Sequence, residues 1–443
     1  MKAKKLLAIL MCVAMIATLV VGCAPQASGP ADQSQAPQTT SGGTEPTQGA
    51  AAPDPVKIAF YGSISGVNSE SGRQGTLAME AAAKYVNENG GIKALGGAPV
   101  EIVYIDSTSD AAQGALPLER ALAEGGLAGI VGSSQSAFAL VSLPILQKYQ
   151  VPAVTGSAAN GTITEQDCEF VFQPAAKASQ FSTLQMEFLR YLADQLGKPF
   201  EELRCAIVYE NSAWGEDNAK ANRVDLEANG LPIVVDENYE AGKLTDASPI
   251  VSKLKAGEVD VLFPSCYAND AKLLMTAMNS MQYKPIIVAG GSAFTWPSLL
   301  NDLGDDVNGI CSADGFVWDA KTTLDNAEFT KIRERYEEEN GEFIPGQGGP
   351  TIISFMLIVE AIENGGSADP ISVRDELRKL NAENSEWFKC LWNGTGSFDE
   401  NGFNAGSEPI ILQWQDNKPR CVFPLEAASS PLINPLTLEP FEN

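Results

Sequence analysis

Short apolar runs alternate with longer amphipathic segments in the first half of the chain. The short runs are rich in β-branched residues and bounded by glycine, proline or polar residues, which predicts strands. They are residues 56–61, 100–105, 127–131 and 151–154. The longer segments place apolar side chains three and four positions apart, which predicts helices. These are residues 75–89, 111–124 and 139–149. Because strands and helices alternate, we expect right-handed crossovers, a parallel sheet and a doubly wound α/β lobe.

The same alternation restarts after Phe172 and predicts a second lobe. The strands expected there are residues 205–209, 233–237, 259–263 and 286–289. The helices expected there are residues 181–195, 215–229, 249–255 and 270–281. Ligands of such sheets bind beyond the carboxyl ends of the strands. We therefore expect a binding cleft between two Rossmann-like lobes and turn to the loops that follow the strands.

Three loops of the first lobe contain mainly small hydroxyl residues and glycine. They are residues 62–66, which include Ser65, residues 132–136, which end at Ser136, and residues 155–160. Free backbone N–H groups and hydroxyls at strand-to-helix turns can hold a carboxylate without a cationic side chain. Ordinary helix capping is the alternative explanation, since Ser, Thr and Asn cap helices in most proteins.

Four long runs of this chain carry a family resemblance. They are VKIAFYGSISG, NENGGIKALGGAPVEIVYID, IVGSSQSAFALVSLPILQKYQVPAVTGSAAN and CAIVYENSAWGED. These runs resemble the type I periplasmic binding proteins. The resemblance covers residues 56 to about 414 and is strongest to the leucine/isoleucine/valine-binding branch, which serves ABC importers. It implies two lobes joined by a three-segment hinge. The implied lobes are residues 55–175 with 318–403, and residues 176–317 with 404–443.

The resemblance also assigns a ligand carboxylate site to the first lobe. By position, its hydroxyl and backbone donors fall on Ser136 and on Ser157, Ala158 and Ala159. The family has a threonine where this chain has Ala159, so one hydroxyl is missing while the backbone N–H remains. An aromatic ring of the family's entry loop falls near Ser71, which is a second departure.

Aromatic residues of the second lobe fit the family pattern better. Trp214 stands in a Trp-Gly-Glu triplet and Tyr267 follows a predicted strand, so the resemblance places both over the ligand. Packing in the core is the alternative for such rings. Phe138, Phe294 and Trp296 are weaker candidates for the same wall. The family's acidic residue, which binds the ligand's ammonium, falls near Gly291. Its absence matters because a buried ammonium needs a charged partner.

The N-terminus has the features of a lipoprotein signal. Three lysines precede an uncharged apolar run that ends at Val-Val-Gly-Cys, and this motif resembles the lipobox with Cys23 as the lipidated residue. We expect residues 1–22 to be a signal peptide. Residues 23–54 contain Ala, Pro, Gln, Ser, Thr and Gly with almost no large apolar side chain, so we expect a flexible tether.

Charge and histidine content exclude whole classes of function. The chain has 56 acidic and 30 basic residues, which makes nucleic acid an unsuitable partner. It has no histidine, so a Ser-His-Asp or Cys-His mechanism and a His-ligated metal are unavailable. The acidic run 334–339 is interpreted as a solvated helix face. No nucleotide-binding or nucleophile motif is present. We expect no catalysis, cofactor or metal.

The sequence therefore predicts a monomeric, membrane-anchored solute-binding lipoprotein outside the cytoplasmic membrane. It would bind an amino acid or a related small carboxylate or amide and deliver it to an ABC permease. A binding lipoprotein that reports to a sensor and an extracytoplasmic hydrolase are the two alternatives. Six cysteines remain after Cys12 and Cys23, and a disulfide between Cys390 and Cys421 is one pairing that an exported chain permits.

Overall fold

The computed structural model describes residues 53–391 and 396–442. The described residues belong to one compact unit. The predicted signal peptide, Cys23 and nearly all of the predicted tether lie outside the described residues. Among the described helices, none is both long and apolar enough to cross a membrane.

The first sheet has five parallel strands in the order β2-β1-β3-β4-β5. These strands are β1 Val56–Gly62, β2 Val100–Asp106, β3 Leu127–Val131, β4 Ala153–Val154 and β5 Val171–Phe172. Every residue of β3 is buried, whereas the edge strand β2 is largely half-buried or exposed. This difference is expected when helices cover both faces of a parallel sheet and leave its edge open.

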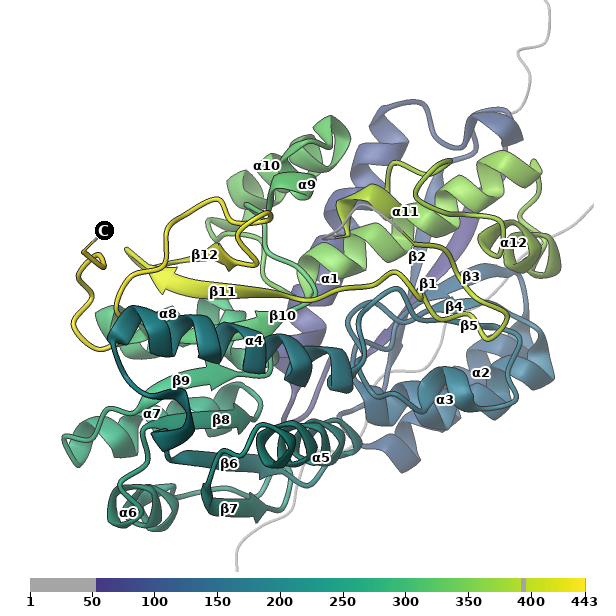
Figure 1. The fold of residues 1–443 in the computed structure, drawn as a ribbon. Coiled ribbons are helices and arrows are strands. Elements are labelled where there is room, and N and C mark those ends of the chain that lie inside the picture. The colour runs from purple at the N-terminus through teal and green to yellow at the C-terminus, as the bar shows by residue number, and fades with distance from the viewer. Residues whose placement is uncertain (1–52, 392–395, 443) are drawn as a thin grey trace, which may run out of the picture. The chain divides into compact units, whose positions relative to one another are not determined.

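The helices of the first sheet come from the beginning of the chain and from its last third (Figure 1). They are α1 Ser69–Glu88, α2 Ala111–Glu124, α3 Ser136–Tyr149, α10 Ala327–Asn340, α11 Gly348–Gly365 and α12 Pro370–Leu377. Helix α11 is almost entirely apolar because it packs against α1 on one side and against β3 and β4 on the other. We call this sheet and its helices the first lobe.

The second sheet has seven strands in the order β12-β11-β10-β9-β8-β6-β7. Strands β6 to β10 are parallel, whereas β11 and β12 form an antiparallel hairpin on β10. The strands are β6 Cys205–Glu210, β7 Ile233–Tyr239, β8 Val261–Ser265, β9 Ile286–Ala289, β10 Cys311–Asp314, β11 Ile410–Gln415 and β12 Lys418–Phe423.

Five helices connect or cover these strands, and we call the whole the second lobe (Figure 1). They are α4 Ala178–Leu196, α5 Ala213–Ala228, α6 Ser248–Ala256, α7 Ala268–Ser280 and α8 Pro297–Leu303, and the short helix α9 Lys321–Leu324 follows β10. The predicted two-lobed, doubly wound α/β fold is confirmed.

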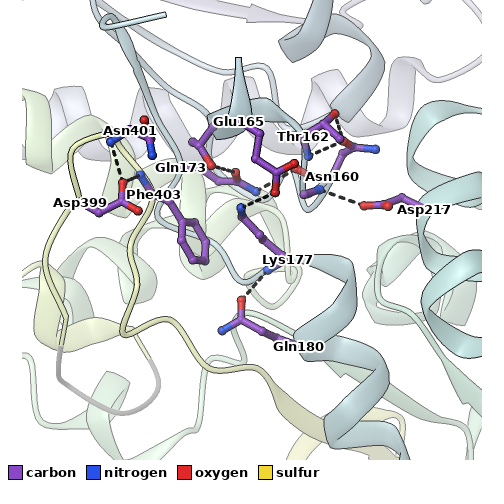
Figure 2. A network of polar contacts seen from close by, with 12 residues as sticks. Asn160, Thr162, Glu165, Gln173, Lys177, Gln180, Asp217, Asp399, Asn401 and Phe403 are labelled. Atoms are coloured by element: carbon purple, nitrogen blue, oxygen red, sulfur yellow. Dashed lines mark hydrogen bonds and ion pairs between the residues drawn. The ribbon is translucent and has the colours of Figure 1, made fainter. Parts of the chain in front are cut away.

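The chain passes between the two sheets three times: after β5, after β10, and before β11. The first and third passages are hydrogen-bonded to each other. The Gln173 N–H donates to the Gly402 carbonyl at 2.8 Å, and the Asn404 N–H donates to the Gln173 carbonyl at 3.0 Å. Figure 2 shows Gln173 and Phe403 at this place, with the Lys177 ammonium 4.5 Å from the centre of the Phe403 ring.

The disulfide considered between Cys390 and Cys421 is not present, and both thiols are free. Cys390 is buried among the apolar side chains of the first lobe, whereas Cys421 lies in β12 within the core of the second lobe. The two residues belong to different cores, which explains why they do not pair. Burial raises the pKa of each thiol to about 12, so both behave as small apolar residues.

Candidate functional site

A cavity lies at the carboxyl ends of the strands of both sheets. The space between its walls is about 470 Å³ and includes volume that is open to solvent. Its lining comprises Ser134, Gln135, Ser157, Ala159, Phe181, Trp214, Tyr267, Gly290, Gly291, Ser292, Trp296, Asp314, Gly346 and Gln347. Loops after β3 and β4 supply one wall, and residues that follow or end β6, β8, β9 and β10 supply the other. The cavity therefore occupies the place that parallel sheets offer to ligands.

The first-lobe wall is built at the N-terminus of α3. Ser134 and Gln135 line the cavity immediately before this helix, and Gln135 holds the N-cap position without a side-chain capping hydrogen bond. The Ser63 hydroxyl donates to Gln135 Oε1, and the Gln135 N–H donates to Ser133 Oγ at 3.1 Å. These bonds fix the wall before any ligand arrives. A helix N-terminus attracts negative charge, so this wall suits a carboxylate.

Two of the predicted carboxylate-site residues line the cavity and two do not. Ser157 and Ala159 are part of the lining. Ser136 lies just behind it, where its hydroxyl accepts a hydrogen bond from the Asn160 N–H at 3.2 Å. Ala158 is buried, and its carbonyl accepts from Gln173 Nε2 at 2.9 Å. In this arrangement Ser136 supports the loop, while Ser134 and Gln135 face the cavity in its place.

Ser65 and Ser71 also lie outside the lining. The Ser65 hydroxyl and N–H both donate to the Asp106 carboxylate, which ties the loop after β1 to the end of β2. Ser71 lies at the start of α1 and is bonded to Gln347, whose Nε2 donates to the Ser71 hydroxyl at 2.7 Å and to the Ser71 carbonyl at 3.1 Å. Gln347 is part of the lining, so Ser71 reaches the cavity only by orienting that amide.

Three aromatic rings stand side by side on the second-lobe wall. The ring centres of Trp214 and Tyr267 are 5.2 Å apart, and those of Tyr267 and Trp296 are 6.4 Å apart. Trp214 is the second residue of α5 and Tyr267 directly precedes α7, so each ring projects from the end of a strand-to-helix turn. The structure brings together the two predicted rings and Trp296. Phe138 and Phe294 are buried elsewhere, outside the lining.

Tyr267 connects the two walls of the cavity. Burial raises the pKa of its hydroxyl well above the usual range, the negative charge of Glu210 adds to this effect, and a side-chain hydrogen bond with Gln135 opposes it. Tyr267 belongs to the second lobe and Gln135 to the first. The contact therefore spans the cavity and depends on the two lobes being close together.

Two further contacts join the lobes at the rim. Asn160 Nδ2 donates to the Ala213 carbonyl at 2.8 Å, and the Gly161 N–H donates to Asp217 Oδ2 at 2.9 Å. Figure 2 shows Asp217 of helix α5 facing the loop that carries Asn160. Because α5 also carries Trp214, these bonds hold the aromatic wall against the first lobe.

Asp314 is the acidic residue of the lining and was not among the predicted site residues. It is 6% exposed and ends strand β10. Burial raises the pKa of its carboxyl to about 7, and hydrogen bonds from Gly315, Thr295 and Phe316 oppose that rise only partly. Gly291, where the resemblance placed an acidic residue, also lines the cavity, and its φ is +85°.

Two polar groups of the lining have no hydrogen-bond partner within the described part of the chain. They are the Ser292 hydroxyl and the Trp296 indole N–H, and both atoms are buried. An unsatisfied buried polar group costs roughly 1–3 kcal/mol, so a ligand that bonds to these groups would regain that energy. The cavity thus contains free donors in addition to its charged and aromatic groups.

A second buried carboxyl, that of Glu210, lies outside the lining. Glu210 ends β6 and is 1% exposed, and its carboxylate accepts from the Ser212 hydroxyl. Burial raises the pKa of Glu210 to about 7, the Ser212 bond lowers it, and the charge of Asp270 raises it further. The other titratable groups coupled to Glu210 are Tyr239, Cys266 and Tyr267.

This buried carboxyl makes stability depend on pH. Its pKa is higher in the folded protein than in the unfolded chain, so the folded state holds an extra proton between about pH 4.5 and 7. The contribution of the Glu210 carboxyl to the free energy of unfolding is fully present below about pH 4.5 and is lost as the pH rises through 7. We expect Glu210→Gln to lie within about 1 kcal/mol of the wild type at pH 5 and to be more stable at pH 8, by about 3 kcal/mol.

Urea unfolding of the ligand-free protein at pH 5 and pH 8 would measure this difference. The wild-type free energy of unfolding should fall more steeply with pH than that of the variant. Equal slopes for the two proteins would show that Glu210 is ionised at ordinary pH in the folded state.

The described residues contain no group of three or more acidic or cysteine side chains placed to hold a metal ion. The acidic run 334–339 lies on α10, where its carboxylates form ion pairs with neighbouring basic residues. Glu337 pairs with Arg333, and Glu339 pairs with Lys84. Tyr336 of the same run is buried in the core.

The chain is similar to known proteins over most of its length. Residues 55–418 match the family model described as periplasmic binding protein. A Leu/Ile/Val-binding protein homolog 7 from Brucella suis biovar 1 (strain 1330) is 27% identical over 381 residues, which cover 85% of this chain and 92% of the relative.

Solved structures share the fold at lower identity. The substrate binding protein LivJ of a branched-chain amino acid transporter from Streptococcus pneumoniae, in complex with isoleucine, superposes with a TM-score of 0.70 at 20% identity. This match covers 84% of this chain and 100% of that one. A solute binding protein from R. palustris in complex with 4-hydroxybenzoate superposes with a TM-score of 0.66 at 22% identity. This match covers 83% of this chain and 95% of that one. The fold, the position of the cavity and the family match agree: the chain belongs to the periplasmic binding protein family.

Proposed function

We propose that this protein is the extracytoplasmic solute-binding lipoprotein of an ABC importer, and that it binds a small amino acid in the cavity between its lobes. The observation that carries this proposal is the cavity, which has a helix N-terminus on its first-lobe wall and both a buried carboxyl group and aromatic rings on its second-lobe wall. These groups complement a carboxylate, an ammonium and an apolar side chain.

Amino acids fit this lining better than other small solutes. The lining has no lysine or arginine, so a dianion or a phosphate would find no cationic partner there. A ligand with a carboxylate but no ammonium would be repelled by the negative charge of Asp314. The names of the relatives support the same class of ligand, because the curated relatives are named as Leu/Ile/Val-binding protein homologs and one structural neighbour holds isoleucine.

Binding would be coupled to closure of the two lobes. The contacts of Tyr267 with Gln135 and of Asp217 with the Gly161 N–H exist only when the lobes are close. A ligand held by both walls adds to these contacts and so favours the closed form. The paired chain passages at Gln173 and Gly402 form the hinge about which the second lobe would move. A permease could then distinguish loaded protein from empty protein by its shape.

The N-terminal segment would hold this body at the membrane. Lipidation of Cys23 after removal of residues 1–22 would anchor the chain, and the tether up to residue 54 would let the folded part move above the lipid surface. The negative net charge suits an exported soluble body.

A thermal-shift screen tests the proposed function. Wild-type protein without its signal peptide is heated with each of the twenty L-amino acids and with 4-hydroxybenzoate. A ligand at 100 times its dissociation constant adds about 2.7 kcal/mol of stability. We expect one or more amino acids to raise the melting temperature. A shift with 4-hydroxybenzoate and with no amino acid would contradict the proposed ligand class.

Trp214 supplies the second readout of the same screen. We expect the active amino acid to change tryptophan fluorescence, because Trp214 lies in the lining beside Tyr267. Trp214→Ala should weaken binding at least tenfold through loss of the ring face. Trp214→Phe is the matched control, since it keeps an aromatic face and should retain most of the affinity. Unchanged affinity in Trp214→Ala would place the ligand elsewhere.

A further inference from the structure

The acidic residue missing at Gly291 has a structural substitute on the neighbouring strand. Strands β9 and β10 are parallel, and Ser312 pairs with Ala289. Continuing this register by two residues places Asp314 beside Gly291. A Cβ atom at Gly291 would lie 3.6 Å from Asp314 Oδ2. The carboxylate of Asp314 thus occupies the space into which a side chain at position 291 would project.

The surrounding glycines make room for this carboxylate. Gly346 lies against it so closely that a Cβ there would overlap both Asp314 Oδ2 and Thr295 Oγ1. A Cβ at Gly291 would also approach the Ala313 carbonyl oxygen to 3.2 Å. The two glycines therefore leave the Asp314 carboxylate as the side chain that fills this part of the cavity.

Asp314 has no cationic partner in the described part of the chain. Its Oδ1 accepts from the Phe316 N–H at 3.3 Å, and neutral groups of Gly315 and Thr295 supply the other contacts that favour the charged form. The lining contains no lysine or arginine, and no positive charge contributes to the carboxyl's pKa. A buried carboxylate without a counter-charge is costly, and a cation brought by the ligand removes that cost.

We propose that Asp314 binds the ammonium group of the ligand and so replaces, from strand β10, the acid that is absent at Gly291. This inference rests on the proposed function, because it assigns one end of an amino acid ligand. The ammonium would lie between Asp314 and the aromatic wall, whose ring faces also attract cations. The carboxylate would lie at the opposite wall, at the N-terminus of α3.

The assignment predicts which molecules the site rejects. A carboxylic acid that lacks the amino group would leave Asp314 unpaired and gain nothing from the second-lobe wall. Recognition of the amino group would thus come from one residue, and neutralising that residue should remove the preference for amino acids over their deaminated analogues. The pair L-leucine and 4-methylpentanoate differs only in this group.

The test measures binding of these two probes by calorimetry at pH 8, where a carboxyl with a pKa of about 7 is ionised. We expect wild-type protein to bind L-leucine at least 100-fold more tightly than 4-methylpentanoate. Asp314→Asn keeps the size and the acceptor oxygen but removes the charge. It should weaken L-leucine binding about 100-fold and leave 4-methylpentanoate binding unchanged or stronger. Glu210→Gln is the matched control, since it neutralises a buried carboxyl outside the lining and should keep the preference.

The outcomes separate this inference from the proposed function. If wild type binds L-leucine and Asp314→Asn binds it equally well, the inference is overturned and the function stands. If wild type binds no amino acid in the screen, the proposed ligand class fails and the inference with it. Should Asp314→Asn not fold, Gly346→Ala replaces it, because the added methyl group must displace the Asp314 carboxylate. If Gly346→Ala keeps the full wild-type preference for L-leucine over 4-methylpentanoate, the inference is overturned.

Discussion

Replacing Trp414 with alanine should lower the free energy of unfolding by about 4 kcal/mol. Trp414 lies on β11 and is fully buried in the core of the second lobe. Its ring packs edge-on against Phe343, with ring centres 5.6 Å apart, and its indole N–H donates to the Phe294 carbonyl at 2.6 Å. The truncation would leave a cavity and an unpaired carbonyl two residues before Trp296.

The matched control is Trp414→Phe, which keeps an aromatic ring but loses the indole N–H and part of the ring system. It should cost about 1–2 kcal/mol, since the Phe294 carbonyl loses its partner. Urea unfolding of both variants gives the two values. A loss below about 1.5 kcal/mol for Trp414→Ala would mean that this core can collapse around the missing ring.

Gly215→Ala is expected to destabilise the protein and to weaken ligand binding together. A methyl group at Gly215 would overlap the carbonyl oxygen of Glu210 on β6, so α5 has to move away from the sheet. Alanine is the better helix former by about 1 kcal/mol. The overlap with backbone outweighs that gain, and we expect a net loss of about 3 kcal/mol.

The displacement also acts on the cavity, because α5 carries Trp214 and Asp217. We expect affinity for the active amino acid to fall at least tenfold in Gly215→Ala, measured by calorimetry at a temperature where the variant is folded. Gly315→Ala is the control, since a Cβ at that position meets no atom within 4 Å. Equal free energies of unfolding for Gly215→Ala and the wild type would show that the methyl group does not overlap the Glu210 carbonyl.

Some elements of this fold begin and end where the sequence predicts, and others do not. Strands Leu127–Val131 and Ile286–Ala289 begin and end where the apolar runs do. Helix α1, in contrast, begins at Ser69 rather than at residue 75, because its first turns are polar and contain Gly72. A Cβ at Gly72 would overlap the Ser63 carbonyl, so tertiary packing requires a glycine where helix propensity disfavours one.

The predicted site residues that line the cavity lie in loops that follow recognisable strands. Trp214, Tyr267, Ser157, Ala159 and Gly291 all line the cavity. Their contacts with a ligand remain predictions. Ser136 and Ala158 lie outside the lining. Ser136 accepts a hydrogen bond from the Asn160 N–H, and the Ala158 carbonyl accepts one from Gln173 Nε2.

Asp314 and Gln347 could not be found in the same way. Asp314 ends a four-residue strand whose sequence, Cys-Ser-Ala-Asp, is too short and too polar to be distinguished by periodicity. Gln347 precedes the apolar helix α11 and reaches the cavity because the chain returns to the first lobe. Both positions depend on contacts between segments far apart in sequence, and local patterns do not contain that information.

The antiparallel hairpin β11–β12 has a consequence for how the protein is made. It supplies two strands of the second sheet from residues 410–423, after the chain has already completed most of the first lobe. Until these residues are available, β10 is an open sheet edge and the core around Trp414 is missing its largest side chain. The second lobe therefore reaches its native state only when nearly the whole polypeptide is present.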